Sequence, residues 1–215
     1  MTYKKIYNSP LGKILLIFDE KYLLELYLEN QKEFDEKYKD KELKSIDEKN
    51  LDISSGEYKI LRETEKWLEI YFSGKNPDFI PPIKVFGSEF RKDVWDILLK
   101  IPYGEIRTYK EVGEELLKSE KYKRVSNQAV GGAIGNNQIL LIIPCHRVIG
   151  SDGGLRGYAG GIEVKRKLLE LEGKGKSKKL GFKIVVKASL LEYIKDFILK
   201  NLCKAKLYDS LSGGG

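Results

Sequence analysis

The chain has 215 residues, of which 41% are hydrophobic and 33% charged, a composition typical of a folded globular protein rather than a disordered one. It contains no apolar run near the roughly 20 residues that cross a bilayer and no N-terminal apolar segment of a secretory signal, so we expect a cytoplasmic protein outside the membrane. Two cysteines and one histidine are too few for a disulfide framework or a zinc site of the usual kind, so we expect no metal and no cofactor.

The formal net charge of +7 is compatible with an anionic partner such as nucleic acid. The excess lies in residues 174–215, which hold 10 basic and 3 acidic residues. Residues 1–83 (14 basic, 17 acidic) and 84–173 (15 basic, 12 acidic) are nearly neutral. The charge balance therefore leaves two interpretations open, a nucleic-acid-binding protein and a solubilising surface.

The N-terminal part of the chain has the pattern of a small sheet with a helix. Two short apolar runs, 11–18 and 22–28, are separated by three charged residues and predict a β-hairpin. Residues 30–55 are densely charged and predict an exposed connection or a weak helix. Apolar residues recur at helical spacing over 56–72. Three prolines within 76–82 exclude a helix there and predict an inter-domain linker.

The next part of the chain is mainly helical. A serine or threonine precedes each of three segments with helical apolar spacing and can cap the helix that begins there. The caps and their helices are Ser88 with 89–99, Thr108 with 109–118, and Ser126 with 127–135. The last two helices, joined by a short loop, have the outline of a helix-turn-helix.

The third of these helices has an unusual composition. Gly131, Gly132 and Gly135 lie within it, and each glycine costs on the order of 1 kcal/mol in helix propensity. Small side chains permit a close approach of the helix backbone to another surface. That surface is either a neighbouring helix in the core or an external partner, and the sequence leaves both possibilities open.

The apolar run 139–143 predicts a buried strand that leads into Pro144-Cys145-His146. A glycine-rich loop over 150–161 can wrap closely around a ligand, and 162–172 predicts a closing helix.

We therefore expect an α/β (α+β) protein with three parts. Residues 1–83 form an N-terminal α/β domain with its linker, and residues 84–173 form a mainly helical C-terminal domain with a helix-turn-helix. Residues 174–215 are a basic extension of undetermined role, native or partly engineered, in which 180–188 predicts a strand and 189–203 an amphipathic helix.

A cysteine followed by the only histidine of the chain is the main chemical signal. A thiolate is a strong nucleophile near neutral pH, and an imidazole can take its proton. Successive residues of a strand point to opposite faces, so Cys145 and His146 would need a water relay or a turn at Pro144. Glu172 is one candidate to orient the imidazole. The alternative is an inert buried cysteine beside a surface histidine.

Residues Ile143-Pro144-Cys145-His146-Arg147-Val148 resemble the active-site motif of the O6-alkylguanine-DNA alkyltransferases, the methylated-DNA–protein-cysteine methyltransferases. An ordered set of further motifs shares this resemblance, which covers about residues 1–173. They are Ser9–Gly12, Tyr71–Gly74, Phe90–Trp95, Ile101–Glu105, Thr108-Tyr109, Ala129–Ala133, Gly157–Gly161 and Lys165–Gly173.

The resemblance implies a DNA repair protein that flips O6-alkylguanine, and also O4-alkylthymine, out of duplex DNA. Cys145 would accept the alkyl group irreversibly, once per molecule. His146 would act as a base through a water, with Glu172 orienting it. Asn137 would brace the active-site turn, and Tyr109 would donate a hydrogen bond to the flipped base and crowd the adjacent phosphate.

For the substrate pocket, the resemblance implies that Tyr158 and the backbone amide of Ala159 border the base. The backbone carbonyls of Cys145 and Val148 would accept from its exocyclic amine, and Lys165 would support the pocket. The implied DNA-contacting residues are Ser126, Gln128, Ala129, Gly131, Gly132, Arg147 and Tyr109. The partner would be double-stranded DNA that contains O6-alkylguanine, bound by a monomer.

Gln128 stands where the family commonly has an intercalating arginine, which predicts weaker DNA affinity or flipping. One alternative is therefore an alkyl-base-sensing DNA-binding protein with weak or no transferase activity, although Cys145 disfavours it. A cysteine hydrolase is a third possibility, disfavoured because the chain has no second, distant histidine.

Overall fold

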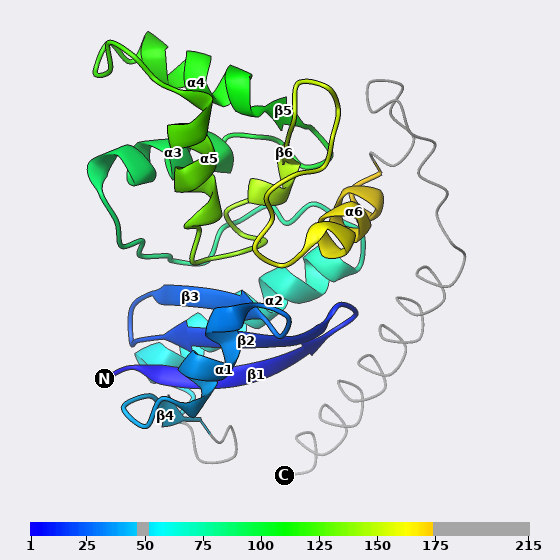
Figure 1. Cartoon of the computed structure of the whole chain (residues 1–215). Coiled ribbons are helices and arrows are strands. Elements are labelled where there is room, and N and C mark those ends of the chain that lie inside the picture. Colours follow the sequence, from blue (N-terminus) through cyan, green and yellow to red (C-terminus); the bar gives the residue numbers. More distant parts are fainter. Residues whose placement is uncertain (47–51, 174–215) are drawn as a thin grey trace.

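The computed structural model describes residues 1–46 and 52–173, and it has the expected α+β architecture (Figure 1). The strand and helix expected at 180–188 and 189–203, like the rest of 174–215, lie outside the described residues. Within the described residues, no helix is both long and apolar enough to span a bilayer.

A four-stranded sheet forms the N-terminal part, with strand order β3-β2-β1-β4. The predicted hairpin is confirmed: β2 (Gly12–Phe18) pairs antiparallel with β3 (Leu23–Leu28). On its other side β2 pairs antiparallel with β1 (Tyr3–Ser9), a strand that the sequence reasoning did not identify, and β1 pairs in parallel with the short β4 (Lys44–Ser45). Helix α1 (Lys32–Lys39) packs near β3.

Helix α2 (Gly56–Phe72) covers one face of this sheet. Ser55 caps it by accepting a hydrogen bond from the Tyr58 amide. Its buried positions recur at helical spacing, so one face packs against the strands. In Figure 1 the helix runs from behind the sheet toward α6 (Ile162–Leu171) in the C-terminal part.

Three helices form the frame of the C-terminal part. They are α3 (Glu89–Leu99), α4 (Tyr109–Lys118) and α5 (Asn127–Gly135). The expected caps are confirmed: Ser88, Thr108 and Ser126 each accept a hydrogen bond from the third residue after them, and Thr108 forms a full capping box. The three helices pack against one another, and α4 and α5 form the expected helix-turn-helix.

The strand expected over 139–143 is wrong. This run is buried but consists of turns, with one isolated bridge between Ile139 and Leu26 of β3. Leu141 has a φ of 70°, which no strand allows. The run ends in a short 3₁₀ turn, η2 (Cys145–Arg147), and in β6 (Val148–Ile149), which pairs in parallel with β5 (Arg107–Thr108).

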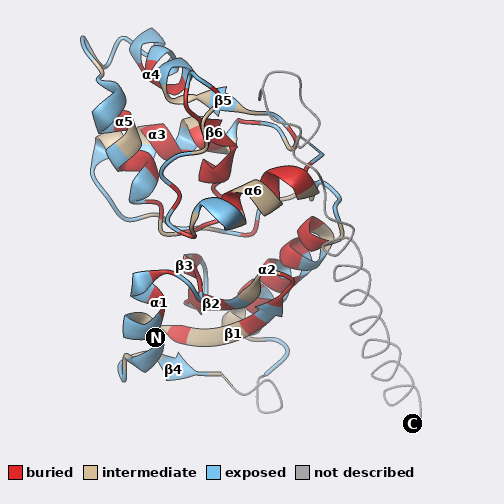
Figure 2. Cartoon of the chain, turned by 45° about the vertical axis from the view of Figure 1, so that its right-hand side comes forward, coloured by how far each residue is buried: buried red, intermediate tan, exposed pale blue. Residues whose placement is uncertain are grey.

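The two parts share one hydrophobic cluster. It contains Leu16 and Leu26 of the sheet, Tyr71 of α2, Trp95 of α3 and Cys145 itself. Figure 2 shows the segment around β6 buried throughout. The cysteine turn therefore lies within the core of the molecule, between the α2 end of the N-terminal part and the helices of the C-terminal part.

Candidate active site

Asn137 organises the turns that carry Cys145. Its side-chain carbonyl accepts from the Ile139 amide at 3.0 Å, and its side-chain amide donates to the Ile143 carbonyl at 2.9 Å. These bonds take the place of the backbone hydrogen bonds that a neighbouring strand would have supplied. The apolar run 139–143 can therefore fold as a loop. The same amide lies 3.1 Å from Cys145 Sγ and can donate to it.

The Cys145 side chain is only 3% exposed. Burial raises the pKa of its thiol, and the Asn137 amide and the Lys165 charge partly oppose that rise. The resting group is therefore a protonated thiol that needs a base, with two neighbours placed to stabilise the thiolate once it forms.

His146 is fully buried beside it, so the alternative of a surface histidine is excluded. Its Nε2 lies 2.8 Å from Glu172 Oε1. Because a carboxylate only accepts, this contact places the imidazole proton on Nε2 and leaves a lone pair on Nδ1. Nδ1 is buried and has no hydrogen-bond partner among the residues that the structure describes. Burial lowers the pKa of His146, against the opposing effect of Glu172.

Glu172 accepts hydrogen bonds from four residues. Besides His146, these are the Tyr71 hydroxyl (2.8 Å), the Gly104 amide (2.9 Å) and two nitrogens of Arg147 (2.9 and 3.0 Å). Burial alone would raise its pKa, but the bonds from His146 and Arg147 outweigh that effect and lower the pKa to about 2. The carboxylate is thus fixed and charged, as an orienting partner for a histidine requires.

The structure corrects the expectation that Arg147 contacts DNA. Its side chain is buried, and its guanidinium is held by Glu172 and by the Ile101 carbonyl at 2.6 Å. These bonds keep the guanidinium inside the protein and away from a nucleic-acid surface. Arg147 lies two residues after Cys145, but Glu172, which binds its guanidinium, lies 25 residues further along the chain.

Lys165 and Tyr109 hold the loop that follows. The Lys165 ammonium is buried and donates to the carbonyls of Val148 (2.5 Å) and Arg156 (2.8 Å). Burial lowers the pKa of Lys165 to about 8. The Tyr109 hydroxyl donates to the same Arg156 carbonyl at 3.0 Å. The Val148 carbonyl, expected to accept from a base, therefore already accepts one hydrogen bond, from Lys165.

Tyr158 lies close to the catalytic histidine candidate. Its ring centroid is 6.3 Å from that of His146, and its buried hydroxyl has no partner within the described residues. Ala159, the next residue, is exposed. The N-terminal part supports this loop, because Asn30 donates to the Gly160 carbonyl and Leu28 packs beside Gly160.

Helix α5 presents its small residues outward. Ser126 caps it, and Gln128, Ala129 and Gly132 are exposed while Gly131 is partly buried. A Cβ added at Gly132 would meet nothing within 4 Å. The core-packing explanation for this glycine is therefore wrong, and close approach to an external surface remains as the explanation.

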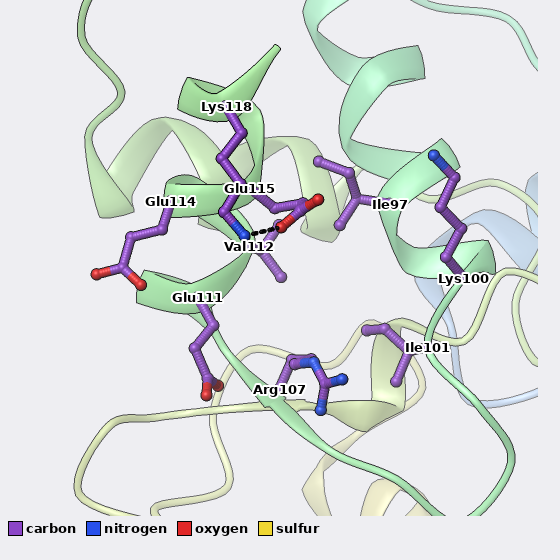
Figure 3. A pocket seen from close by; sticks show the side chains of 9 residues that line it. All are labelled: Ile97, Lys100, Ile101, Arg107, Glu111, Val112, Glu114, Glu115 and Lys118. Atoms are coloured by element: carbon purple, nitrogen blue, oxygen red, sulfur yellow. Dashed lines mark hydrogen bonds and ion pairs between the residues drawn. The ribbon is translucent and has the colours of Figure 1, made fainter.

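A hollow of about 390 Å³ between α3 and α4 is lined by none of the expected site residues (Figure 3). Charged side chains of both signs surround it, and two of them, Lys118 and Glu115, pair at 2.7 Å. It has no convergent reactive groups, so the Cys145 region remains the site.

Sequence reasoning missed two contributors to this site. The helical spacing over 56–72 gives Tyr71 no role beyond packing, and Gly104 has no predicted role beyond its place in the motif Ile101–Glu105. Both residues lie in motifs that carry the family resemblance, and those motifs are the sequence signal from which their place in the site could have been predicted.

Comparisons with known proteins agree along most of the chain. Residues 2–85 match the family model described as 6-O-methylguanine DNA methyltransferase, ribonuclease-like domain, and residues 89–174 match 6-O-methylguanine DNA methyltransferase, DNA binding domain. A methylated-DNA–protein-cysteine methyltransferase of Methanosarcina barkeri is 43% identical over 174 residues, which is 79% of this chain and 96% of that protein. A relative of the same name from Methanosarcina acetivorans is 39% identical over 171 residues, 80% of this chain and 98% of that one. Among solved structures, Mycobacterium tuberculosis OGT in complex with DNA superposes with a TM-score of 0.66 at 31% identity, covering 83% of this chain and 97% of that one.

Proposed function

The chain belongs to the 6-O-methylguanine DNA methyltransferase family, and from this premise we propose that it repairs DNA by moving the alkyl group of O6-alkylguanine to its own Cys145. DNA repair by alkyl transfer to a cysteine is the activity of the family; the acceptor and the roles below are proposed from the geometry together with what the family resemblance implies. One observation carries the proposal most: His146, the residue after Cys145, is bound to Glu172 through Nε2, while its buried Nδ1 has no hydrogen-bond partner in the part of the chain that the structure describes.

The transfer begins with the thiol proton. A water passes it from Cys145 Sγ to His146 Nδ1, and the charged Glu172 stabilises the imidazolium that forms. The Asn137 amide and the Lys165 ammonium stabilise the thiolate. Sulfur then attacks the alkyl carbon in line, a carbon–sulfur bond forms, and the carbon–O6 bond breaks. The electron pair of the broken bond stays on the guanine, which takes up a proton from water, while the imidazolium returns the thiol proton to water; the protein retains a stable thioether.

The flipped base needs hydrogen-bonding groups at its edges and an apolar surface against its ring. Tyr158 supplies an apolar face, and the Ala159 amide lies near O6. Tyr109 donates to the base once its hydroxyl hydrogen turns from the Arg156 carbonyl, to which it is bonded here, and the carbonyls of Cys145 and Val148 accept from the exocyclic amine of the base. Lys165 acts by holding the Val148 and Arg156 carbonyls in place, and O4-alkylthymine is a second substrate of the same pocket.

The DNA partner meets α5. Its exposed face of small residues allows a close approach to the minor groove, and Gln128 fills the space that the flipped base leaves. Such binding is directed mostly to phosphates and depends weakly on sequence. We propose that one monomer binds one lesion in double-stranded DNA, and that the protein works in the cytoplasm, at the nucleoid.

The test is intact-mass analysis after incubation with O6-benzylguanine and with a duplex that carries O6-methylguanine. We expect one stable adduct per chain, mapped to Cys145, and none in Cys145→Ser. Because Cys203 is the only other cysteine, an adduct there would contradict the assignment. No adduct despite tight binding to the duplex would favour the alkyl-base sensor, and repeated turnover would favour a hydrolase.

A further inference from the structure

The hydroxyl of Tyr71 reaches the catalytic pair from the other part of the chain. It lies 2.8 Å from Glu172 Oε1, to which it donates, and 3.2 Å from His146 Nε2. Tyr71 lies on the buried face of α2, in its last turn, and is separated from Glu172 by 101 residues in the sequence. Through this hydroxyl, helix α2 of the N-terminal part contributes to the site.

Aromatic packing fixes where this hydroxyl lies. The Tyr71 ring is fully buried, stacked on Trp67 with centroids 5.1 Å apart. Phe72 and Tyr103 pack edge-on against it, at 5.6 and 6.0 Å. Aromatic pairs of this geometry hold their rings in defined orientations. The hydroxyl therefore has one position, against the shared oxygen of Glu172.

The hydrogen atoms at this junction can be assigned from donor and acceptor chemistry. Burial and the negative charge of Glu172 raise the pKa of Tyr71 well above its usual value, so the hydroxyl keeps its proton and gives it to the carboxylate. Its oxygen lone pair then faces the proton on His146 Nε2. A tautomer with the proton on Nδ1 would turn an Nε2 lone pair toward Glu172 Oε1 at 2.8 Å, which is repulsive.

We propose that Tyr71 is a positioning residue that acts through Glu172: by donating to the carboxylate it limits how strongly Glu172 stabilises the imidazolium, and so keeps His146 neutral with its Nδ1 able to receive the thiol proton. This inference rests on the proposed function. Tyr71 also neutralises part of the carboxylate charge, so without it Glu172 would stabilise the imidazolium more strongly. The basicity of His146 is thus set partly by a residue of the N-terminal part.

Other groups also lie around the imidazole within the described residues. The charges of Arg147 from its own turn, and of Lys165 and Glu172 from α6 and its end, act on its pKa, and the ring of Tyr158 from the following loop packs against it. None of them changes in Tyr71→Phe, so a shift in that variant reports the lost hydroxyl.

The single histidine makes the experiment direct, because its ¹⁵N signals need no assignment among several. We would titrate ¹⁵N-histidine-labelled wild type and Tyr71→Phe, and measure the rate of Cys145 benzylation by O6-benzylguanine against pH. In Tyr71→Phe we expect the histidine midpoint and the acid limb of the rate profile to move together to higher pH. We also expect the Nε2–H tautomer to stay populated, because Glu172 still accepts from it, and the rate near neutral pH to fall on the order of tenfold, as for outer partners of a working histidine.

Tyr103→Phe is the matched control. It removes a hydroxyl from the same aromatic cluster, one that bonds to the Leu171 carbonyl at 3.3 Å. We expect its histidine midpoint to match that of the wild type. A slower Tyr71→Phe whose histidine midpoint equals that of Tyr103→Phe would mean a structural role only and would overturn the inference.

A double-mutant cycle separates an effect that Tyr71 exerts through Glu172 from a general structural effect of the substitution. If Tyr71 acts through Glu172, its loss should change the rate much less in a Glu172→Gln background than in the wild type. Equal losses in both backgrounds would refute the inference. Failure of the wild type itself to form the Cys145 adduct would instead refute the proposed function.

Discussion

Gly132 in α5 offers a substitution that should strengthen the fold and weaken DNA binding. A Cβ at this position meets nothing within 4 Å. Replacing a helix-interior glycine by alanine removes a propensity cost of about 0.8–1.0 kcal/mol. For a chain of this size, Gly132→Ala should therefore raise the midpoint of thermal unfolding by roughly 2–4 °C.

The same methyl group would stand between the helix backbone and the DNA. Forcing a methyl into a close-packed contact costs about 1–3 kcal/mol, which corresponds to roughly a 5- to 150-fold weaker Kd. Fluorescence anisotropy with a labelled duplex at fixed salt measures this change. Benzylation of Cys145 by free O6-benzylguanine shows whether the active site remains intact.

Gly113→Ala in α4 is the matched control. Its Cβ would meet Val125 and Val130 at 3.7 Å, an ordinary contact inside the helix pair. It should stabilise the protein by a similar amount and leave DNA affinity unchanged. If Gly132→Ala gained stability but bound duplex as tightly as the wild type, this face of α5 would not be the one that approaches DNA.

Three further predictions concern the DNA contact, the pocket and pH. Gln128→Arg should tighten duplex binding and steepen the dependence of log K on log salt by about one unit; anisotropy titrations at several salt concentrations measure this, and equal slopes would contradict it. In Gly160→Ala the new Cβ would lie 2.7 Å from Leu28 and 2.8 Å from Tyr158, so Tyr158 must move; benzylation should slow on the order of tenfold or more, and an unchanged rate would argue against a tight pocket loop. Because the pKa of Glu172 is lowered from 4.5 to about 2 in the folded protein, its contribution of roughly 3 kcal/mol is present above pH 4.5 and lost as pH falls toward 2. Urea unfolding across this range should show a steeper loss for the wild type than for Glu172→Gln, and parallel curves would refute this.

Local signals in the sequence predicted much of the fold. Ser88, Thr108 and Ser126 begin their helices as expected, because a cap depends on residues within one turn. The run at 139–143 was wrongly predicted as a strand, because apolar content alone does not distinguish a strand from a buried loop. The deciding side chain, Asn137, lies just outside the run.

The site was predicted less completely, for a reason of distance along the chain. Cys145 and His146 are adjacent, and the family resemblance supplied Glu172 and Asn137. Arg147 and Tyr71 both bind Glu172, from which they are separated by 25 and 101 residues in the sequence. Hydrophobic periodicity and helix caps hold no information about contacts at that range. For this reason Arg147 was predicted to contact DNA, although it forms a buried ion pair.

The hydrophobic cluster that joins sheet and helices also bears on folding. Cys145 belongs to the same cluster as Leu16 of β2, so the two parts should melt together in a single calorimetric transition. Cleavage of the proline-rich connection would leave two fragments that each expose half of a core. A destabilising substitution in the sheet would thus lower the amount of folded protein without altering the chemistry at Cys145. Substitutions far from the thiol would therefore reduce repair capacity by reducing the abundance of the folded protein.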